Sequence, residues 1–588
     1  MLKALTSLIA VAVIGTSFCI FNSFAEAKPI LSGEACEFSA LTDVRNVSEN
    51  TTMAVMSIAG LLNRDTPTVY TVSNEDDVDW QQLLLANCSY DKVPALDIMK
   101  RYFGNQFDTS GRKNVVMYGW NESSFALSSV VTMCGVLDAV PLDEALYNHL
   151  VQITPNGMKN AFIVLDTRGR WSSQEEAVNY TVIHALNKTT SMAFQQSSDV
   201  QHGYLVDWIV SQRLFAHYLS DACIPFTENN RILKNLVANA PWQKPIRVYG
   251  YNSQDPIFGG DSFEAETNCI NTMGQVATQY ARNLAFLQNL YPINATAPRG
   301  STTGPFKQPQ TTGKTYDPSK KYVALVYGDM DNIDFVQSFG RQHMQYRSEQ
   351  CENKKCFPLS WTMSPNLLEF SPSMIRWYYE MAAKTGGQDS FMMPPSGTLY
   401  AYPGMMPSDV QTEFVEQQNF QANLMDSTSS ISWEWFFAWD LDFKTYFPRY
   451  IDARSQQEVT SRNFFLNDVP WPIPIPGMWL KGETYVIFGD VSDPSSNVVA
   501  FKPAFNWQEN GIGGLQLTPE DCAKEIESTC EVGTVQYVYM IQNNPVGKVF
   551  QMVGNITDPN IEIVSHADLA DLARQKAQRE NRGLRHGA

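Results

Sequence analysis

The fold is most readily inferred from residues 322–334, which read YVALVYGDMDNID. Tyr322–Tyr327 is a continuous apolar run, as expected of a strand that is covered on both faces in a parallel sheet. Gly328 ends the run, and the acidic residues Asp329 and Asp331 follow directly. In β/α barrels the catalytic groups lie at the C-terminal ends of the strands. The stretch therefore predicts a strand that delivers two carboxyl groups to the edge of a sheet.

Two more strands, each followed by polar or aromatic residues, are predicted after this one. Leu359–Met363 is an apolar run that ends at Ser364, where a helix-start signal leads into a helix over Met374–Met381. Phe391–Met393 is a third apolar run, and it continues into the loop Ser396–Pro403. Three successive strand ends thus carry polar or aromatic motifs, which predicts a C-terminal (β/α) barrel-like domain. An open doubly wound sheet is the alternative, because it too places its site beyond the strand ends.

The N-terminal half is predicted to form parallel α/β subdomains. Before residue 298, apolar runs alternate with helical patterns, which indicates two or three small subdomains. Apolar residues between Leu205 and Leu219 fall on one face of a helix, so a helix is expected there. The predicted division is a signal peptide at 1–27, an N-terminal α/β region at 28–297, a linker at 298–320, a barrel-like catalytic domain at 321–565, and a helical, then disordered tail at 566–588.

The first 27 residues have the features of a secretory signal peptide. Lys3 supplies the positive charge, Leu8–Ile14 the apolar core, and Ala25 and Ala27 the small residues of a cleavage site. A membrane anchor is the alternative, but the apolar run is too short to span a bilayer. Eight Asn-x-Ser/Thr sequons are present, at Asn46, Asn50, Asn87, Asn121, Asn179, Asn187, Asn294 and Asn555. We expect a secreted glycoprotein, either extracellular or in the lumen of the secretory pathway.

Cysteine usage agrees with an oxidising compartment. Removal of the signal peptide leaves nine of the ten cysteines, and this odd count implies a free thiol or an intermolecular bond. Cys351 and Cys356 are predicted to form a local disulfide, and so are Cys522 and Cys530. Zinc ligation is the alternative, but a C-x4-C spacing without a histidine cluster fits a zinc site poorly.

The charge balance limits the partners of the protein. Its formal net charge is −18, which argues against nucleic acid as a partner, because phosphates require basic stripes. Strongly anionic polysaccharides are disfavoured for the same reason. The basic cluster at Arg574–Arg585 is predicted to be a frayed helix end. No membrane span is expected after the signal peptide, and no feature of the sequence indicates an oligomeric state.

Asp329 and Asp331 are the leading catalytic candidates. In an extended strand their side chains share a face, about 7 Å apart. Glycoside hydrolysis needs one protonated carboxyl group and one ionised carboxylate, and two nearby carboxylates resist joint ionisation. The alternative is an Asp-rich turn in which Asn332 and Asp334 cap the next helix. No cofactor is predicted; calcium or magnesium at this cluster is the other interpretation of its oxygen ligands.

A loop with paired tyrosines is predicted to border the same site. Gly397 permits backbone geometries that other residues resist, and Tyr400 and Tyr402 project to one side of an extended chain. Their rings suit a sugar-binding wall; the alternative is a loop that covers the core with two buried tyrosines. The predicted substrate-binding residues are Asn332, Trp361, Ser396, Gly397, Tyr400, Tyr402 and Glu434.

Trp361 and Glu434 come from other segments. Trp361, at the second strand end, is expected to stack on a pyranose ring. Glu434 lies in the aromatic and acidic cluster Trp433–Asp442 and is a candidate acid partner, although a buried aromatic cluster with solvated carboxylates at its edge is the favoured interpretation. His343 is expected on a helix surface, and no paired-histidine zinc motif is present.

Several of these motifs together resemble one known family. Ser396–Pro403 (SGTLYAYP) is similar to the signature of the GxGYxYP family of "putative glycoside hydrolases". Val326–Gln337, Pro358–Pro365 and Ile58–Arg64 resemble other blocks of that family, in the same order. Leu399 stands where the family has its second glycine, and Met330 stands between the two aspartates, where a glycine is expected.

The resemblance implies a secreted glycosidase that acts on a neutral oligosaccharide or polysaccharide through a carboxylate pair at a strand end. Both departures place a bulkier side chain near the cleft, which would narrow it or mark an inactive relative. The alternative function is a non-catalytic carbohydrate-binding or cell-surface protein that retains the fold.

Overall fold

A computed structural model describes most of the chain. The described residues are 35–107, 111–120, 124–250, 269–270, 275–278, 281–292, 306–309, 311–353, 356–398, 400–434, 439–452, 462–468, 484–493, 496–508, 514–541 and 544–580. The predicted signal peptide, the sequons at Asn121 and Asn294, Leu399 and the last eight residues lie outside this set.

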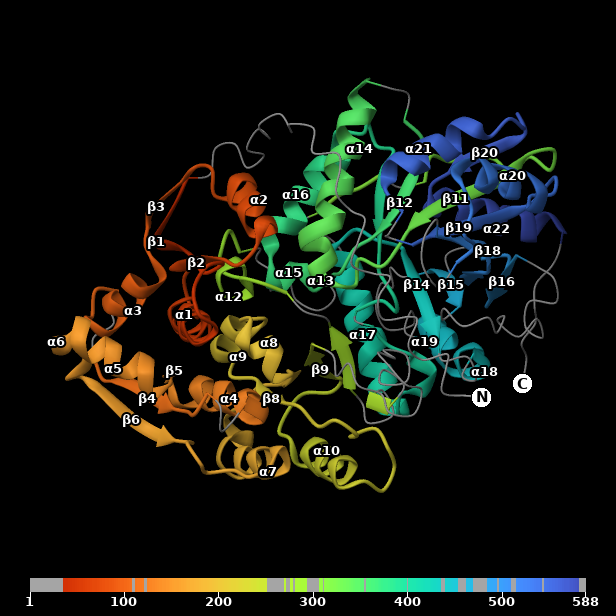
Figure 1. Ribbon diagram of the computed structural model, residues 1–588. Helices are drawn as coiled ribbons and strands as arrows, with labels where there is room; N and C mark the ends of the chain where they lie inside the picture. Colours follow the sequence, from red (N-terminus) through yellow and green to blue (C-terminus); the bar gives the residue numbers. More distant parts are fainter. Residues whose placement is uncertain are drawn as a thin grey trace, which may run out of the picture.

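Three small parallel sheets form the N-terminal half (Figure 1). Their strand orders are β2-β1-β3, β5-β4-β6 and β10-β9-β7-β8, and every neighbouring pair is parallel. Such sheets need connections long enough to cross over, and helices supply them. The strands are β1 (Cys36–Asp43), β2 (Val69–Val72), β3 (Cys88–Lys92), β4 (Lys113–Met117), β5 (Ala139–Leu142), β6 (Ala161–Asp166), β7 (Met192–Phe194), β8 (Phe215–His217), β9 (Ile246–Tyr249) and β10 (Gln275–Thr278).

Short helices cover these sheets. Side-chain caps begin several of them; Asn74, for example, accepts from the Asp77 backbone in a capping box at the start of α2. The helices are α1 (Glu49–Leu62), α2 (Glu75–Leu84), α3 (Ala95–Phe103), α4 (Leu127–Leu137), α5 (Glu144–Ile153), α6 (Pro155–Met158), α7 (Gln174–Ala185), α8 (Ser197–Gln201), α9 (Val206–Gln212), α10 (Glu228–Asn239) and α12 (Leu284–Leu287).

Two further sheets form the C-terminal half, with strand orders β13-β12-β11-β19-β18 and β14-β15-β17-β16. β20 also pairs with β11, and β16 is the only antiparallel strand among the described residues of these sheets. The strands are β11 (Lys321–Tyr327), β12 (Leu359–Thr362), β13 (Asp389–Met392), β14 (Ser429–Glu434), β15 (Asn463–Asp468), β16 (Tyr485–Phe488), β17 (Val498–Phe501), β18 (Pro503–Trp507), β19 (Val535–Met540) and β20 (Ile561–Val564).

These two sheets join at two places, which gives a barrel-like arrangement. Met393, directly after β13, forms an isolated parallel bridge with Ser430 of β14. On the other side only Lys502 separates β17 from β18, and these strands pair with β15 and β19, respectively. The two sheets thus follow each other in a ring, joined by a single bridge at one seam and by the chain at the other. The predicted class, parallel α/β subdomains followed by a barrel-like domain, is confirmed.

Helices surround this ring, and one of them covers its base. The helices are α13 (Ile333–Phe335), α14 (Arg341–Asn353), α15 (Leu367–Phe370), α16 (Pro372–Ala383), α17 (Ser408–Leu424), α18 (Trp439–Leu441), α19 (Phe447–Asp452), α20 (Pro519–Thr529), α21 (Val546–Asn555) and α22 (His566–Glu580). In α22, His566 bonds to Ser360 near the start of β12, and Arg574 bonds to Asn463 at the start of β15. α22 therefore lies across the N-terminal ends of the strands, and we call the opposite ends, which carry the acidic turn, the mouth of the barrel.

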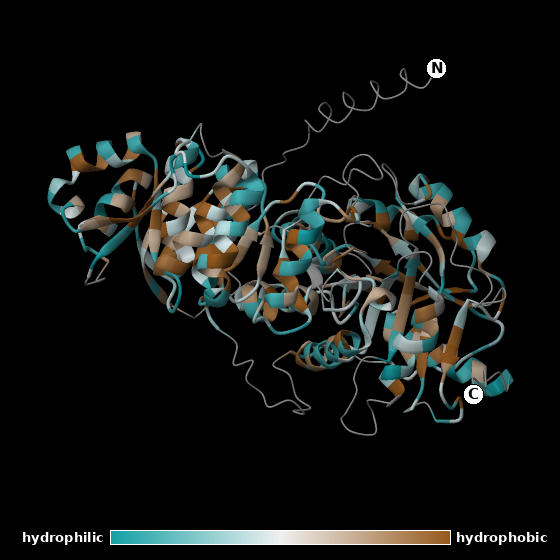
Figure 2. Cartoon of the chain, turned by 90° about the horizontal axis from the view of Figure 1, so that it is seen from below, coloured by the Kyte–Doolittle hydropathy of each residue, from teal (hydrophilic) through white to brown (hydrophobic). Residues whose placement is uncertain are grey.

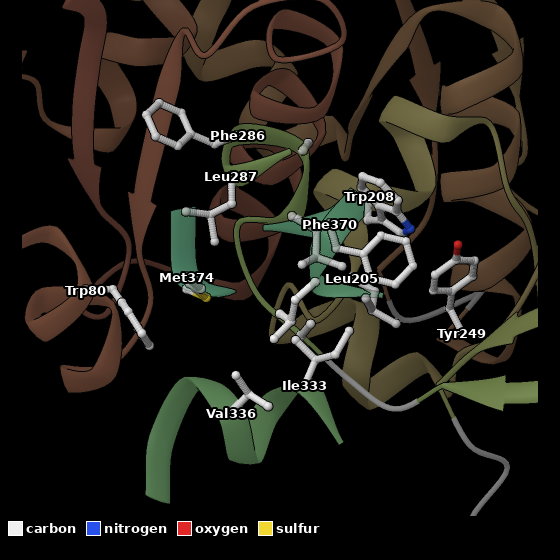
Figure 3. Packing of buried hydrophobic residues seen from close by; sticks show 14 of the residues in the cluster. Trp80, Leu205, Trp208, Tyr249, Phe286, Leu287, Ile333, Val336, Phe370 and Met374 are labelled. Carbon is white, nitrogen blue, oxygen red and sulfur yellow. The ribbon is translucent and has the colours of Figure 1, made fainter. Parts of the chain in front are cut away.

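The N-terminal half packs directly against the helices of the barrel. Trp80 of α2 donates from its indole nitrogen to the Gln337 carbonyl at 2.7 Å, and Arg282 pairs with Asp334 at 2.6 Å. Figure 3 shows Trp80, Phe286 and Phe370 in one buried cluster that side chains from both halves supply. Apolar segments lie mainly on the strands and the inward helix faces, whereas hydrophilic segments lie outside (Figure 2). The two halves therefore share a continuous core.

Three sequence predictions need correction. The helix expected over Leu205–Leu219 ends at Gln212, because Arg213 adopts a left-handed backbone (φ 55°) and Phe215 begins β8. The predicted tail begins as a packed helix, and Arg574 is buried rather than frayed. Residues 306–309 and 311–320 form no helix or strand, but they lie along the barrel; Gln308, for example, bonds to the Phe391 backbone.

One predicted disulfide is wrong and one is confirmed. Cys351 and Cys356 are bonded, and Cys36–Cys88 and Cys223–Cys269 are additional disulfides. Cys522 and Cys530 are free and buried. Helix α20 separates these two cysteines by eight residues, or about 12 Å of helix rise, which is too far for a disulfide between Cα atoms.

Candidate active site

The acidic turn lies at the mouth of the barrel. β11 runs through the ring and ends at Tyr327, and Gly328 leads into the turn. A Cβ atom at Gly328 would stand 1.9 Å from the hydroxyl of Tyr539 on the neighbouring strand β19. Asp329 then adopts a left-handed backbone with φ 67°, which is uncommon for a residue other than glycine and is often found at functional sites. Close packing against Tyr539 thus fixes where the first carboxyl group stands.

Tyr539 links the two predicted catalytic residues. Its hydroxyl donates to Oδ1 of Asp329 at 2.6 Å. The pKa of Tyr539 is raised by its burial and by the negative charges of Asp329 and Asp331. Both carboxyl groups are therefore close enough to Tyr539 to affect its ionisation. Asp331 is itself partly buried. Its burial, with a smaller contribution from the charge of Asp329, raises the pKa of Asp331 to about 8. Near neutral pH, Asp331 therefore holds a proton.

Three more polar side chains lie near the C-terminal ends of β14, β15 and β18. Asn506 stands opposite Tyr539, and Asn467 stands opposite Trp433, so each pair shares a face of the sheet. The rings of Trp433 and Tyr539 lie 6.4 Å apart and thus bring the two pairs together. Nε1 of Trp433 and the Oδ1 atoms of Asn467 and Asn506 are buried without a hydrogen-bond partner among the described residues. Such groups cost about 1–3 kcal/mol each, which is typical of a site that a ligand completes.

The tyrosine loop, Ser396–Pro403, packs against Trp433 of β14. Ser396 holds the loop to β14, because its hydroxyl bonds to both the nitrogen and the carbonyl of Trp433. Gly397 has φ 93°, and a Cβ atom there would stand 2.3 Å from the Gln418 side chain. The Tyr400 ring contacts the Trp433 ring at 5.5 Å. The loop therefore positions Trp433 rather than lining a cleft itself.

Tyr400 and Tyr402 are both buried, so the core-covering interpretation of this loop is the one that the structure bears out. Tyr400 is 6% exposed and Tyr402 is fully buried. They project to the same side, as predicted, and their hydroxyls lie 3.3 Å apart. Both pack in a cluster with Ile246 and Val248 of β9, so the tyrosine side chains join the barrel to an N-terminal sheet.

Trp361 does not reach the mouth. Its ring is fully buried and packs against Tyr327 at 4.8 Å. These two residues stand opposite each other on β12 and β11, on the face turned toward the surrounding helices. Side chains alternate between the faces of a strand, and Ser360, the neighbour of Trp361, faces inward to His566. We therefore drop Trp361 as a sugar-stacking residue.

Glu434 also lies on the outer face of the ring. It is fully buried, and its Oε2 accepts from the Gly404 nitrogen at 2.6 Å. Asp442 is buried beside it, and this burial together with the charge of Glu434 raises the pKa of Asp442 strongly. Of the predicted aromatic and acidic cluster, Trp439 is buried, and Glu434 and Asp442 are buried rather than solvated; Trp435 and the Asp440 side chain lie outside the described set. Glu434 holds the loop that follows Tyr402 and does not join Asp329.

The remaining acidic-turn residues have helix-capping roles. Asn332 caps α13 by accepting from the Asp334 nitrogen at 3.0 Å, and Asp334 is paired with Arg282. His343 is half-buried and bonds to Tyr327 instead of lying free on the surface. Among the described residues no group of three His, Cys, Asp or Glu side chains is placed to hold a metal ion.

Sequence reasoning missed Tyr539, Asn467 and Asn506. Tyr539 lies in the run VQYVYM (Val535–Met540), which carries a buried-strand signal but no acidic neighbour. Asn467 and Asn506 lie near the C-terminal ends of β15 and β18. Only the register between strands shows that Asn506 stands beside Tyr539 and Asn467 beside Trp433.

Comparisons with known proteins agree with the family resemblance predicted from the sequence. Residues 319–463 match the model described as "GxGYxYP putative glycoside hydrolase C-terminal domain", and residues 40–113 match "GxGYxYP_N 1st domain". The structure is similar to that of a "putative hydrolase from Bacteroides thetaiotaomicron VPI-5482", with a TM-score of 0.69 and 18% identity over 94% of this chain and 99% of that chain. At this identity the likeness shows the fold alone.

A second solved structure, the 4-alpha-glucanotransferase from Thermococcus litoralis, gives a TM-score of 0.30 with 11% identity over 42% of this chain and 40% of that chain, and it carries no argument. No curated protein matches this chain.

Proposed function

We propose that this chain, which matches both domain models of the GxGYxYP family, is a glycoside hydrolase with Asp329 and Asp331 as its catalytic pair. One arrangement carries the proposal: at the C-terminal strand ends the Tyr539 hydroxyl donates to Asp329 at 2.6 Å, and two residues further on lies Asp331, whose pKa is raised by its burial. Glycosidases use such a pair of carboxyl groups in two different protonation states. The family description supports the same reaction class.

In this mechanism Asp331 is the general acid. It gives its proton to the glycosidic oxygen as the bond from that oxygen to the anomeric carbon breaks, and the departing sugar leaves as an alcohol. Asp329 faces the positive charge that develops on the sugar ring, and it acts either as the nucleophile or as the base that takes a proton from water. The Tyr539 hydroxyl holds Asp329 in place.

The substrate is a neutral oligosaccharide or polysaccharide. The net charge of −18 disfavours an anionic chain. At the mouth, Trp433 offers an N–H donor, and Asn467 and Asn506 offer acceptors that have no partner among the described residues. Sugar hydroxyls both donate and accept hydrogen bonds, so they match this mixed set.

The protein is further proposed to be a secreted glycoprotein. Three disulfides support an oxidising compartment. The sequon asparagines Asn46, Asn87, Asn179, Asn187 and Asn555 are exposed, whereas Asn50 is partly buried and bonds to Asp143. Within the described part of the chain no helix is long and apolar enough to cross a membrane.

The experiment is a screen of the secreted protein against neutral oligosaccharides, with new reducing ends as the readout and with EDTA in a parallel series. Wild-type protein should cleave at least one of them, and Asp329→Asn and Asp331→Asn should not. Asp334→Asn is the matched control, because this carboxylate lies in the same turn but pairs with Arg282. Equal turnover in the wild type and both variants would remove the pair from the mechanism.

A further inference from the structure

A polar cavity lies where the two halves of the chain meet. It has a volume of about 320 Å³, at the small end of the range for ligand pockets. Arg247 of β9 and Glu369 of α15 close one side with an ion pair at 2.6 Å. Gln417 of α17 lines it from the barrel half, and Thr190 and Gln243 line it from the N-terminal half. Pockets between domains are a common place for ligands.

This cavity is distinct from the barrel mouth. β9 alternates its side chains between two faces: Ile246 and Val248 pack with the tyrosine loop, whereas Arg247 and Tyr249 line the cavity. The strand therefore stands between the cavity and the loop that supports Trp433. A ligand here would contact neither Asp329 nor Tyr539.

The chemistry of the wall favours an uncharged ligand rich in hydroxyl groups. Arg247 and Glu369 neutralise each other, so neither an anion nor a cation gains an unpaired partner. Side-chain amides and hydroxyls supply both donors and acceptors. The indole N–H of Trp208 is buried and directed at the Tyr249 hydroxyl (Figure 3). The side-chain amides and hydroxyls of the wall are therefore the groups that would bond to an occupant.

We propose that this cavity is an accessory site that binds one unit of a neutral saccharide. Planar side chains such as those of Arg247, Glu369 and Gln417 can each bond to two adjacent hydroxyls, and vicinal hydroxyls are what a sugar ring presents. Trp208 also lines the cavity, and its ring is held by packing against Phe370 at 5.3 Å. The site does not depend on the chemistry proposed at the barrel mouth.

Ligand-observed saturation-transfer NMR tests the proposal on the full-length protein, with glucose, galactose, mannose and N-acetylglucosamine as probes. Gln417→Ala should weaken binding of the preferred sugar about three- to tenfold, as expected for one lost hydrogen bond. Glu416→Ala is the matched control, because this neighbour on α17 is exposed and does not line the cavity. Melting temperatures of both variants verify that the fold is retained.

Asn467→Ala separates this site from the barrel mouth. If the cavity binds sugar, saturation transfer persists in Asn467→Ala, and adding Gln417→Ala to that variant weakens the remaining binding about three- to tenfold. A signal that Asn467→Ala alone abolishes, or that Gln417→Ala leaves unchanged in the Asn467→Ala background, would overturn the proposal. Hydrolysis is read out separately, so an inactive protein that still binds sugar here would contradict the proposed function and not the accessory site.

Discussion

The barrel contains two acid pairs that differ in their exposure and in what surrounds them. Asp329 and Asp331 stand at the C-terminal strand ends, where both remain partly exposed and a phenol donates to one of them. Glu434 and Asp442 are fully buried on the outer face of the ring, where Glu434 accepts from a backbone nitrogen. A perturbed pKa occurs in both pairs. The comparison teaches that a raised pKa identifies catalysis only where a substrate can reach the acid.

The largest expected difference between the pairs is in turnover. Asp331→Asn should lower kcat about 10²- to 10⁴-fold, because general acid catalysis contributes that much. Asp442→Asn should leave kcat within about twofold, since this acid touches no substrate in our account. Initial rates with the best oligosaccharide from the screen measure both. Comparable losses in the two variants would remove the distinction between the pairs.

Tyr539→Phe should give the next largest effect. Removal of a hydrogen bond to a charged group costs about 1.5–3 kcal/mol, which corresponds to a loss of about 10- to 100-fold in kcat if the bond persists in the transition state. Tyr537→Phe is the matched control, because its hydroxyl bonds to the Leu466 carbonyl and not to an acid. A full rate in Tyr539→Phe would show that Asp329 needs no support from this phenol.

The pH profile sharpens the comparison further. Asp331 must be protonated to act, and its pKa is about 8, so kcat/KM should fall about tenfold per pH unit above that value. The stability of the fold should also fall at high pH. The pKa of Asp331 in the folded protein lies above its ordinary value of 3.8. The contribution of the protonated Asp331 to the free energy of unfolding is therefore complete below pH 4 and is lost as the pH rises through 8. Asp331→Asn should remove that loss in denaturant titrations. A descending limb near pH 4 instead would contradict the assignment.

The smallest effect on turnover is expected at the fully buried pair, Glu434 and Asp442. Glu434→Ala should lower the free energy of unfolding by about 1–3 kcal/mol, because the Gly404 nitrogen would lose its acceptor. Turnover at saturating substrate should stay within about twofold. Urea titration followed by fluorescence measures the first quantity, and initial rates measure the second. A strong loss of kcat without a loss of stability would place Glu434 in the chemistry.

Local sequence patterns predicted the strand end that carries the two aspartates, but not the residues from distant strands that contact them. The apolar run at Tyr322–Tyr327 and the glycine after it were enough to place Asp329 and Asp331 at a strand end. Trp361 was placed on the wrong face, because an apolar strand covered on both sides carries no alternation that tells inward from outward. Tyr539 comes from a strand some 200 residues later, and only the pairing of β11 with β19 brings it to Asp329.

Helix and disulfide errors have similar causes. The pattern over Leu205–Leu219 fits a helix, but a left-handed residue at Arg213 ends it, and nothing in the local apolar spacing marks that residue. Spacing alone suggested a bridge between Cys522 and Cys530, whereas the helix between them holds them apart. In each case the backbone conformation between the residues, rather than their distance along the chain, decided the outcome.

A crystal structure of the Asp331→Asn variant with an oligosaccharide that the wild type cleaves tests the central claim most directly. Our account predicts a glycosidic oxygen within hydrogen-bond distance of the side chain at position 331, with the anomeric carbon facing Asp329 and sugar hydroxyls on Asn467 or Asn506. An oligosaccharide bound in the crystal with its glycosidic bond away from the acidic turn would contradict it.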